Sequence, residues 1–300
     1  MAWSTLFLAE IWQLVVSYQD GYYFDFVPFV RLPRLPKHHG QYDAWAALVH
    51  ETWTSWYAEF GTGRLDRLIA CVPRMRDVII LHAVYSNDLP LLQRLHATYD
   101  LHNCKNRLLN LAASRGHVDI LRFLHDIGHT GCSIYGMNLA ARYGFLDVVI
   151  FLHENRTEGC DTSAMDCAAA FGHLDVLKWL HVHRTEGCTT RSMDKAAGNG
   201  HLQVVQWLHY HRHKGCTSDA MHRAITNGHL DVVQWLHEHR NEGCLAHSMS
   251  MAAARGDARM VAWLYVNRKE CDPLLALDAA RQSGHLHIVD LLHGHFQLAL

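Results

Sequence analysis

Residues 160–187 are CDTSAMDCAAAFGHLDVLKWLHVHRTEG, and two close copies follow directly, CTTRSMDKAAGNGHLQVVQWLHYHRHKG at 188–215 and CTSDAMHRAITNGHLDVVQWLHEHRNEG at 216–243. The same 28-residue spacing separates six cysteines: Cys104, Cys132, Cys160, Cys188, Cys216 and Cys244. Cys271 comes one residue early. The 28-residue spacing also separates seven glycines: Gly116, Gly144, Gly172, Gly200, Gly228, Gly256 and Gly284. A fixed period of this size is typical of a stack of identical supersecondary units.

Each unit predicts two helices joined by a tight turn. The first helix, residues 162–171, carries apolar residues at i, i+3 and i+4: Met165, Ala168 and Ala169. Thr162 is placed to cap its first amides. We expect Gly172 to end it, because a residue without Cβ enters the left-handed conformation at little cost. The second helix has a predicted buried row: Leu174, Leu177 and Leu180. The tryptophans beside this row predict packing between units, because they recur with the same period: Trp179, Trp207, Trp235 and Trp263.

The pattern divides the chain into three parts. Residues 1–40 predict an N-terminal helical element followed by a linker, because Pro33 and Pro36 are incompatible with a regular helix. Residues 41–75 are rich in tryptophan and predict a degenerate repeat or a cap. The remainder, 76–300, predicts eight repeats: 76–103, 104–131, 132–159, 160–187, 188–215, 216–243, 244–270 and 271–300.

The run AAAFGHLDVLKWL at residues 168–180 resembles the core of an ankyrin repeat, A-A-x-x-G-H-x-x-V-V-x-x-L-L. The usual ankyrin period is about 33 residues, and the usual T-P-L-H opening is replaced here by S-A-M-D and its relatives. The missing residues would come from the β-hairpin finger, so we expect short loops there. The resemblance covers about residues 76–300. It implies an all-α helical-repeat solenoid that serves as a non-enzymatic scaffold for protein–protein interaction.

Composition narrows the class of partner and the compartment. The formal net charge is −2, which argues against nucleic acid or an acidic membrane surface as the partner. Nine cysteines, in a chain for which we predict no leader peptide, suggest free thiols and an intracellular location, cytoplasmic or nuclear. Residues 4–19 are apolar but predict neither a signal peptide nor a membrane span. We expect a monomer that is not inserted in a membrane.

The recurring cysteines and histidines favour structural roles. Equivalent atoms in neighbouring repeats should lie about 8–10 Å apart, too far for a shared zinc ion or a disulfide. Histidines recur after the glycine and in the second helix of most repeats, which predicts a hydrogen bond needed by each layer, such as one to a loop carbonyl. A catalytic constellation would be needed once. We therefore expect no catalytic residue, no metal and no cofactor.

The variable positions of the first helix are the predicted binding residues. They stand three, six and ten or eleven residues after each cysteine, on the side opposite the apolar stripe. In proteins similar to this one, that face lines the concave side where partners bind, although such a face can also be merely solvated. The predicted set is Arg107, Tyr135, Asn138, Tyr143, Asp166, Phe171, Arg191, Asp194, Asp219, His222 and His247.

A second hypothesis concerns the N-terminus. Residues 4–21 (STLFLAEIWQLVVSYQDG) are loosely similar to an F-box helix. That similarity implies a substrate adaptor for ubiquitin ligation, in which the N-terminal segment contacts a Skp1-type partner while the repeats hold the target. Capture with a Skp1-type protein would distinguish the two hypotheses.

Overall fold

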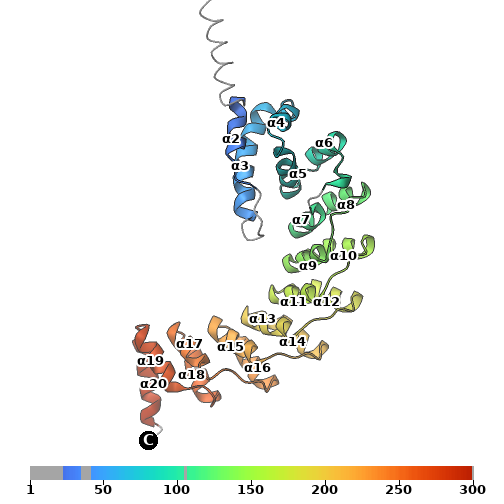
Figure 1. The fold of residues 1–300 in the computed structure, drawn as a ribbon. Coiled ribbons are helices and arrows are strands. Elements are labelled where there is room, and N and C mark those ends of the chain that lie inside the picture. The colour runs from blue at the N-terminus through green and yellow to red at the C-terminus, as the bar shows by residue number, and fades with distance from the viewer. Residues whose placement is uncertain (1–22, 35–41, 105–106, 299–300) are drawn as a thin grey trace, which may run out of the picture. The chain divides into compact units, whose positions relative to one another are not determined.

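The computed structural model describes residues 23–34, 42–104 and 107–298, and every regular element within these ranges is a helix (Figure 1). The chain divides into two compact units. The first consists of the described part of residues 1–112 together with 119–131, and the second consists of 113–118 and 132–300. The predicted all-α fold is confirmed. The N-terminal segment of the F-box hypothesis lies outside the described residues.

The helices of the first unit are short apart from α3. In chain order they are η2 (Phe24–Phe26), α2 (Val27–Arg31), α3 (Tyr42–Phe60), α4 (Leu65–Cys71), α5 (Met75–Tyr85), α6 (Leu89–Tyr99), η4 (Leu101–Asn103), α7 (Leu108–Arg115) and α8 (Val118–Asp126). The unit boundary falls within α7 and at the start of α8.

Aromatic side chains form the core of the first unit. Phe26 and Phe29 are fully buried, and the Phe29 ring meets the edge of Trp56 at a centroid distance of 5.5 Å. Arg74 donates hydrogen bonds to three carbonyl oxygens at the end of α2. Residues 24–31 of the predicted N-terminal part are thus helical, and the burial of Phe26 and Phe29 holds them against α3. Residues 1–22 and 35–41 lie outside the described part.

Two histidines lie in contact between α3 and α5. His82 is buried, and its Nε2 lies 3.0 Å from Nδ1 of His50, with the two rings stacked. Its own Nδ1 is buried without a hydrogen-bond partner. Burial, assisted by repulsion from His50, lowers the pKa of His82 from 6.5 to about 4.

This pKa shift predicts acid sensitivity of the first unit. The unfolded chain binds a proton at His82 below pH 6.5, whereas the folded chain does so only near pH 4. Stability is therefore lost as the pH falls from about 6.5 to 4, by at most about 1.4 kcal/mol per pH unit. His82→Leu should flatten this part of the profile in denaturant titrations of the full chain. Equal slopes for wild type and His82→Leu would contradict the prediction, and His102→Leu, at an exposed position, is the control.

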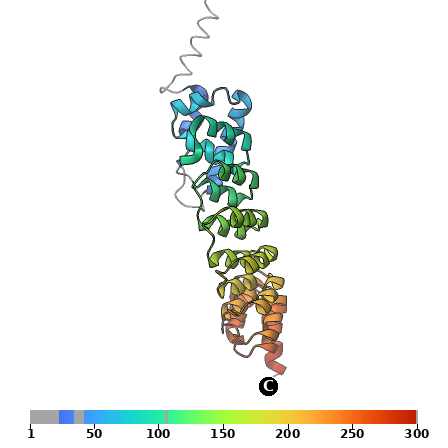
Figure 2. The ribbon, with the colours of Figure 1, turned by 90° about the vertical axis from the view of Figure 1, so that its right-hand side faces the viewer.

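The second unit is a stack of helix pairs. Its first helices are α9 (Ile134–Tyr143), α11 (Thr162–Ala170), α13 (Arg191–Gly198), α15 (Ser218–Asn227), α17 (Ser248–Ala254) and α19 (Pro273–Gln282). Its second helices are α10 (Leu146–Asn155), α12 (Leu174–His183), α14 (Leu202–His211), α16 (Leu230–His239), α18 (Ala258–Asn267) and α20 (Leu286–Leu298). Each first helix packs on the next first helix and on its own second helix (Figures 1 and 2). This is the predicted helical-repeat solenoid.

Helix α11 shows why the repeat folds locally as it does. The predicted stripe of Met165, Ala168 and Ala169 is buried. Gly172 follows the helix with φ = +80°, and a Cβ there would lie 2.7 Å from Nδ1 of His201 in the next repeat. Both the backbone conformation and this close approach require glycine. The cap differs from the prediction, because Asp161 and not Thr162 accepts the amide hydrogen bond, from Ser163 at 2.8 Å.

The histidines hold neighbouring repeats together. The Nε2 atom of His173 lies 3.0 Å from the carbonyl oxygen of Arg142, and since that oxygen can only accept, Nε2 carries the proton. In the second helices, the His181 ring meets Trp207 of the next repeat edge-on at 5.1 Å, and Arg212 donates to His181 Nδ1 at 3.0 Å. The predicted hydrogen bond to a carbonyl is found for His173 and for His285, but the acceptors, Arg142 and Ala254, lie in the last turn of the preceding first helix and not in a loop.

Candidate functional site

The predicted binding residues divide into exposed and buried groups. Six are exposed: Arg107, Tyr135, Tyr143, Phe171, Arg191 and His247. Two are half-buried: Asp219, which pairs with Arg223 of its own helix, and His222. Three are buried: Asn138, Asp166 and Asp194. Arg107 belongs to the first unit and the others to the second.

The prediction that the residues six positions after the cysteine belong to an exposed binding face needs correction. The Asp166 carboxylate accepts hydrogen bonds from the Thr189 amide at 2.8 Å, from the Thr189 hydroxyl at 2.6 Å and from the Ser192 hydroxyl. All three donor groups belong to the next repeat. Because burial of a carboxylate is favourable only when its oxygens are hydrogen-bonded, Asp166 contributes to stacking.

The same contact recurs with different chemistry in other layers. Asp194 accepts from the amide and hydroxyl of Thr217 at 2.7 and 3.0 Å. Burial raises the Asp194 pKa, although the hydrogen bonds from Thr217 oppose that shift. Asn138 donates to Asp161 at 2.9 Å. We name these contacts the inter-repeat bridges, defined by four pairs: Asn138–Asp161, Asp166–Thr189, Asp194–Thr217 and His222–Ser248.

The sequence contains a signal for these bridges. A polar residue directly follows the buried methionine of the first helix, and the residue after the next cysteine is Asp or Thr in three successive repeats. A residue type that recurs at the same position in successive repeats has a structural role in each repeat. The same reasoning predicted structural roles for the histidines. Applied to this position, it would have separated Asp166 and Asp194 from the exposed residues.

Four of the six exposed residues lie on or directly after α9, α11 and α13: Tyr135, Tyr143, Phe171 and Arg191. Three aromatic rings are about half exposed, Tyr135 at 55%, Tyr143 at 48% and Phe171 at 45%. The Arg142 guanidinium, which the predicted set omits, lies 4.9 Å from the centre of the Phe171 ring. We define the aromatic–basic patch as Tyr135, Arg142, Tyr143, Phe171, Arg191 and Lys195.

The cations of this patch remain available to a ligand. None of Arg142, Arg191 and Lys195 forms an ion pair with a carboxylate among the described residues, whereas the nearby Asp166 is occupied in its bridge. Lys195 and Arg142 both lie close enough to the Cys167 thiol for their charges to act on its pKa, which burial raises. The patch therefore combines apolar rings with unpaired cations.

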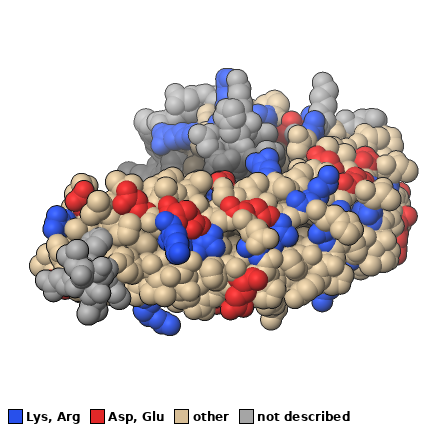
Figure 3. Space-filling model, turned by 90° about the horizontal axis from the view of Figure 1, so that it is seen from below, with Lys and Arg blue, Asp and Glu red and all other residues tan. Residues whose placement is uncertain are grey.

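Charge elsewhere on the molecule is mixed. On the face seen in Figure 3, acidic and basic side chains are interspersed. Exposed apolar side chains also occur on the second helices, for example Tyr210 and Val182. Tyr210 and the exposed Lys178 provide an aromatic and a basic residue on the opposite row of helices, which makes them useful controls.

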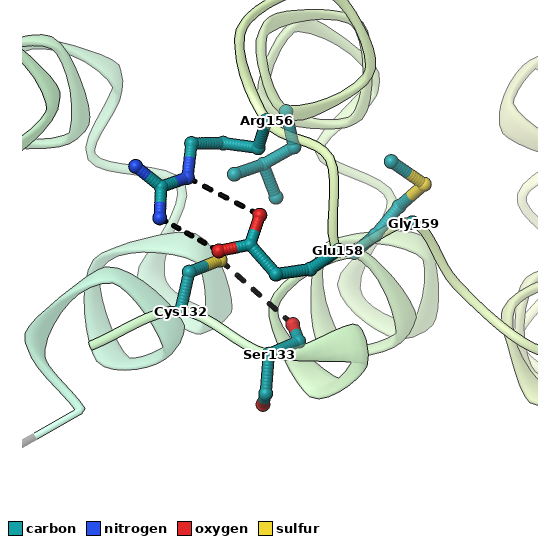
Figure 4. A pocket seen from close by; sticks show the side chains of 7 residues that line it. Cys132, Ser133, Arg156, Glu158 and Gly159 are labelled. Atoms are coloured by element: carbon teal, nitrogen blue, oxygen red, sulfur yellow. Dashed lines mark hydrogen bonds and ion pairs between the residues drawn. The ribbon is translucent and has the colours of Figure 1, made fainter. Parts of the chain in front are cut away.

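The loops between repeats contain a second recurring arrangement that the sequence reasoning missed. Arg156 pairs with Glu158 at 2.6 Å beside Cys132, whose thiol donates to the Ser133 carbonyl oxygen at 3.8 Å (Figure 4). Burial and the Glu158 charge raise the pKa of Cys132 to about 11. The sequence signal is R-x-E-G-C, at residues 156–160, 184–188 and 240–244. The Cys132 thiol is therefore protonated at neutral pH and is a poor nucleophile.

The predicted distance between cysteines of neighbouring repeats fails for one pair. The sulfur atoms of Cys244 and Cys271 lie 3.3 Å apart. All nine cysteines are free thiols. Within the described ranges, no group of three His, Cys, Asp or Glu side chains is placed to hold a metal ion.

Fold and surface together define a class of protein, a helical-repeat scaffold that exposes variable side chains on one row of helices. The family model for ankyrin repeats (many copies) matches residues 80–125, 139–181, 165–209, 193–237 and 221–265, which cover more than half of the chain. The chain belongs to the ankyrin-repeat family. Ankyrin repeats are generally protein–protein interaction modules. They are typically non-enzymatic.

No curated protein matches the chain. No helix among the described residues combines the length and apolar character needed to cross a bilayer.

Proposed function

We propose that this protein is a non-enzymatic scaffold that binds a protein partner through the exposed face of its first helices. The observation that carries the proposal is the aromatic–basic patch. Two of the half-exposed rings lie on α9 and the third directly follows α11, and exposed apolar surface beside polar groups is typical of interaction sites. Interface hot spots are enriched in aromatic and arginine side chains.

The chemistry of the patch favours one kind of ligand segment. Arg142 and Arg191 can form bidentate hydrogen bonds with carboxylates, and a neighbouring aromatic or aliphatic side chain of the partner can pack on Phe171 or Tyr143. The partner segment would therefore carry Asp or Glu beside apolar residues. Contacts at Asp219, His222 and His247 of the same unit, and at Arg107 of the first unit, remain predictions.

A double substitution tests the patch. Tyr135→Ala with Arg191→Ala should leave the fold nearly intact, since both side chains are exposed and such changes cost about 0.5 kcal/mol or less. Affinity should fall at least tenfold, about 1.4 kcal/mol. The probes are peptides selected against the wild-type chain from a displayed random library, and their affinities are measured by fluorescence anisotropy.

The matched control is Lys178→Ala with Tyr210→Ala, which removes one basic and one aromatic residue from the second helices. It should leave peptide affinity unchanged. Loss of binding in this control alone would place the binding surface on the second helices. Because rings and cations also suit single-stranded nucleic acid, an oligonucleotide is tested in parallel. Tight oligonucleotide binding that depends on Tyr135 and Arg191 would overturn the protein-partner proposal.

A further inference from the structure

Cys244 and Cys271 depart from the regular repeat. In the last loop the sequence is RKEC at residues 268–271, so the glycine that usually separates the glutamate from the cysteine is absent. Cys271 lies two residues before α19, and its sulfur lies 3.3 Å from that of Cys244, which stands in the loop before α17. Cys271 is buried and Cys244 is partly exposed. The two thiols therefore lie in contact, one of them open to solvent.

The surroundings distinguish Cys244 from its equivalents. Its sulfur faces Glu270 at 3.7 Å, and Arg268 pairs with that carboxylate. The hydrogen bond from Cys271 lowers the pKa of Cys244, and the same hydrogen bond raises that of Cys271. At the equivalent Cys160 and Cys216, burial instead raises the pKa to about 11. Cys244 is thus the better nucleophile of the pair.

We propose that Cys244 and Cys271 form an intramolecular disulfide by exchange with a low-molecular-weight disulfide such as oxidised glutathione. The Cys244 thiolate attacks one glutathione sulfur, the glutathione S–S bond breaks, and one glutathione thiolate leaves. Cys271 then loses its proton and attacks the Cys244 sulfur, and the second glutathione thiolate leaves and is protonated. Two protein thiols are oxidised and one oxidised glutathione is reduced to two thiols.

The geometry allows this bond with little rearrangement. The sulfur atoms need to approach from 3.3 Å to about 2.05 Å, a change of about 1.3 Å. The bond would join the loops that precede α17 and α19, and so link two consecutive repeats covalently. The inference does not depend on the proposed binding function.

The test uses the full chain, folded and reduced, with oxidised glutathione as the probe. After quenching by alkylation, mass spectrometry of the wild type should show a loss of two hydrogens and a peptide pair linked through Cys244 and Cys271. Cys271→Ser should retain a glutathione adduct on Cys244, because nothing resolves it. Cys244→Ser should react at least tenfold more slowly. Circular dichroism verifies that both variants remain folded.

Cys216→Ser is the matched control, because Cys188 and Cys216 stand in consecutive repeats at the regular spacing. It should leave formation of the Cys244–Cys271 bond unchanged. Glutathione adducts on Cys216 as readily as on Cys244, or a linked peptide that appears only after denaturation, would overturn the proposal.

Discussion

Trp235→Ala is expected to lower the free energy of unfolding of the second unit by about 3–5 kcal/mol. Trp235 is only 9% exposed, and its ring is stacked on His239 at 4.4 Å while the edge of His209 meets it at 5.2 Å. His209 belongs to the preceding repeat, so truncation removes contacts within one repeat and between two. Because coupling between neighbours holds a repeat stack together, the unfolding transition should also broaden.

Circular dichroism in a denaturant series measures this effect. Tyr210→Ala is the control, since Tyr210 is 67% exposed although its ring also contacts His209 at 5.0 Å. It should change the free energy of unfolding by about 0.5 kcal/mol or less. Similar midpoints for the two variants would mean that the tryptophans do not couple the repeats.

Asp166→Ala should cost about 2–4 kcal/mol. The substitution leaves the Thr189 amide and the hydroxyls of Thr189 and Ser192 without their acceptor, and Ser192 is buried. The expected loss reflects these unsatisfied donors more than the loss of the carboxylate itself. Asp166→Asn should cost less, because the amide oxygen still accepts one of the hydrogen bonds.

The comparison for this prediction is Asp175→Ala, an exposed carboxylate at the start of α12. Its effect should stay near 0.5 kcal/mol. An Asp166→Ala variant as stable as Asp175→Ala would show that Thr189 and Ser192 find other acceptors.

The fold was predictable because the residues that recur with the 28-residue period, such as glycine at the helix end, favour few backbone conformations. Gly172 can be assigned as a helix end from the sequence, since few residues other than glycine adopt a left-handed backbone conformation there. The alanines beside Met165 likewise indicate a closely packed helix. By contrast, the burial of Phe26 and Phe29 depends on a long-range contact with α3, and no local pattern shows it.

The candidate site was only partly predictable, for a physical reason. Helical periodicity places Asp166 and Tyr135 on similar sides of their helices, but it does not show where the next repeat begins to cover that side. The covering repeat buries Asp166 and leaves Tyr135 exposed. The contact between Cys244 and Cys271 arises from the deletion of a single loop residue, whose effect on distance cannot be judged from spacing alone.

The inter-repeat bridges restrict which repeats can stand next to each other. Loss of residues 188–215 would bring Asp166 against Thr217, the type of hydroxyl donor that it already uses. Loss of residues 216–243 would instead put Leu245 in the place of Thr217 and Ser248 in the place of Ala220, so Asp194 would exchange the Thr217 hydroxyl for a serine hydroxyl placed like that of Ser192 beside Asp166. Although the repeats look like interchangeable copies, their order is constrained by chemical compatibility at each junction. A change in copy number therefore preserves the donors of the bridge at one junction and replaces them with a different set at another.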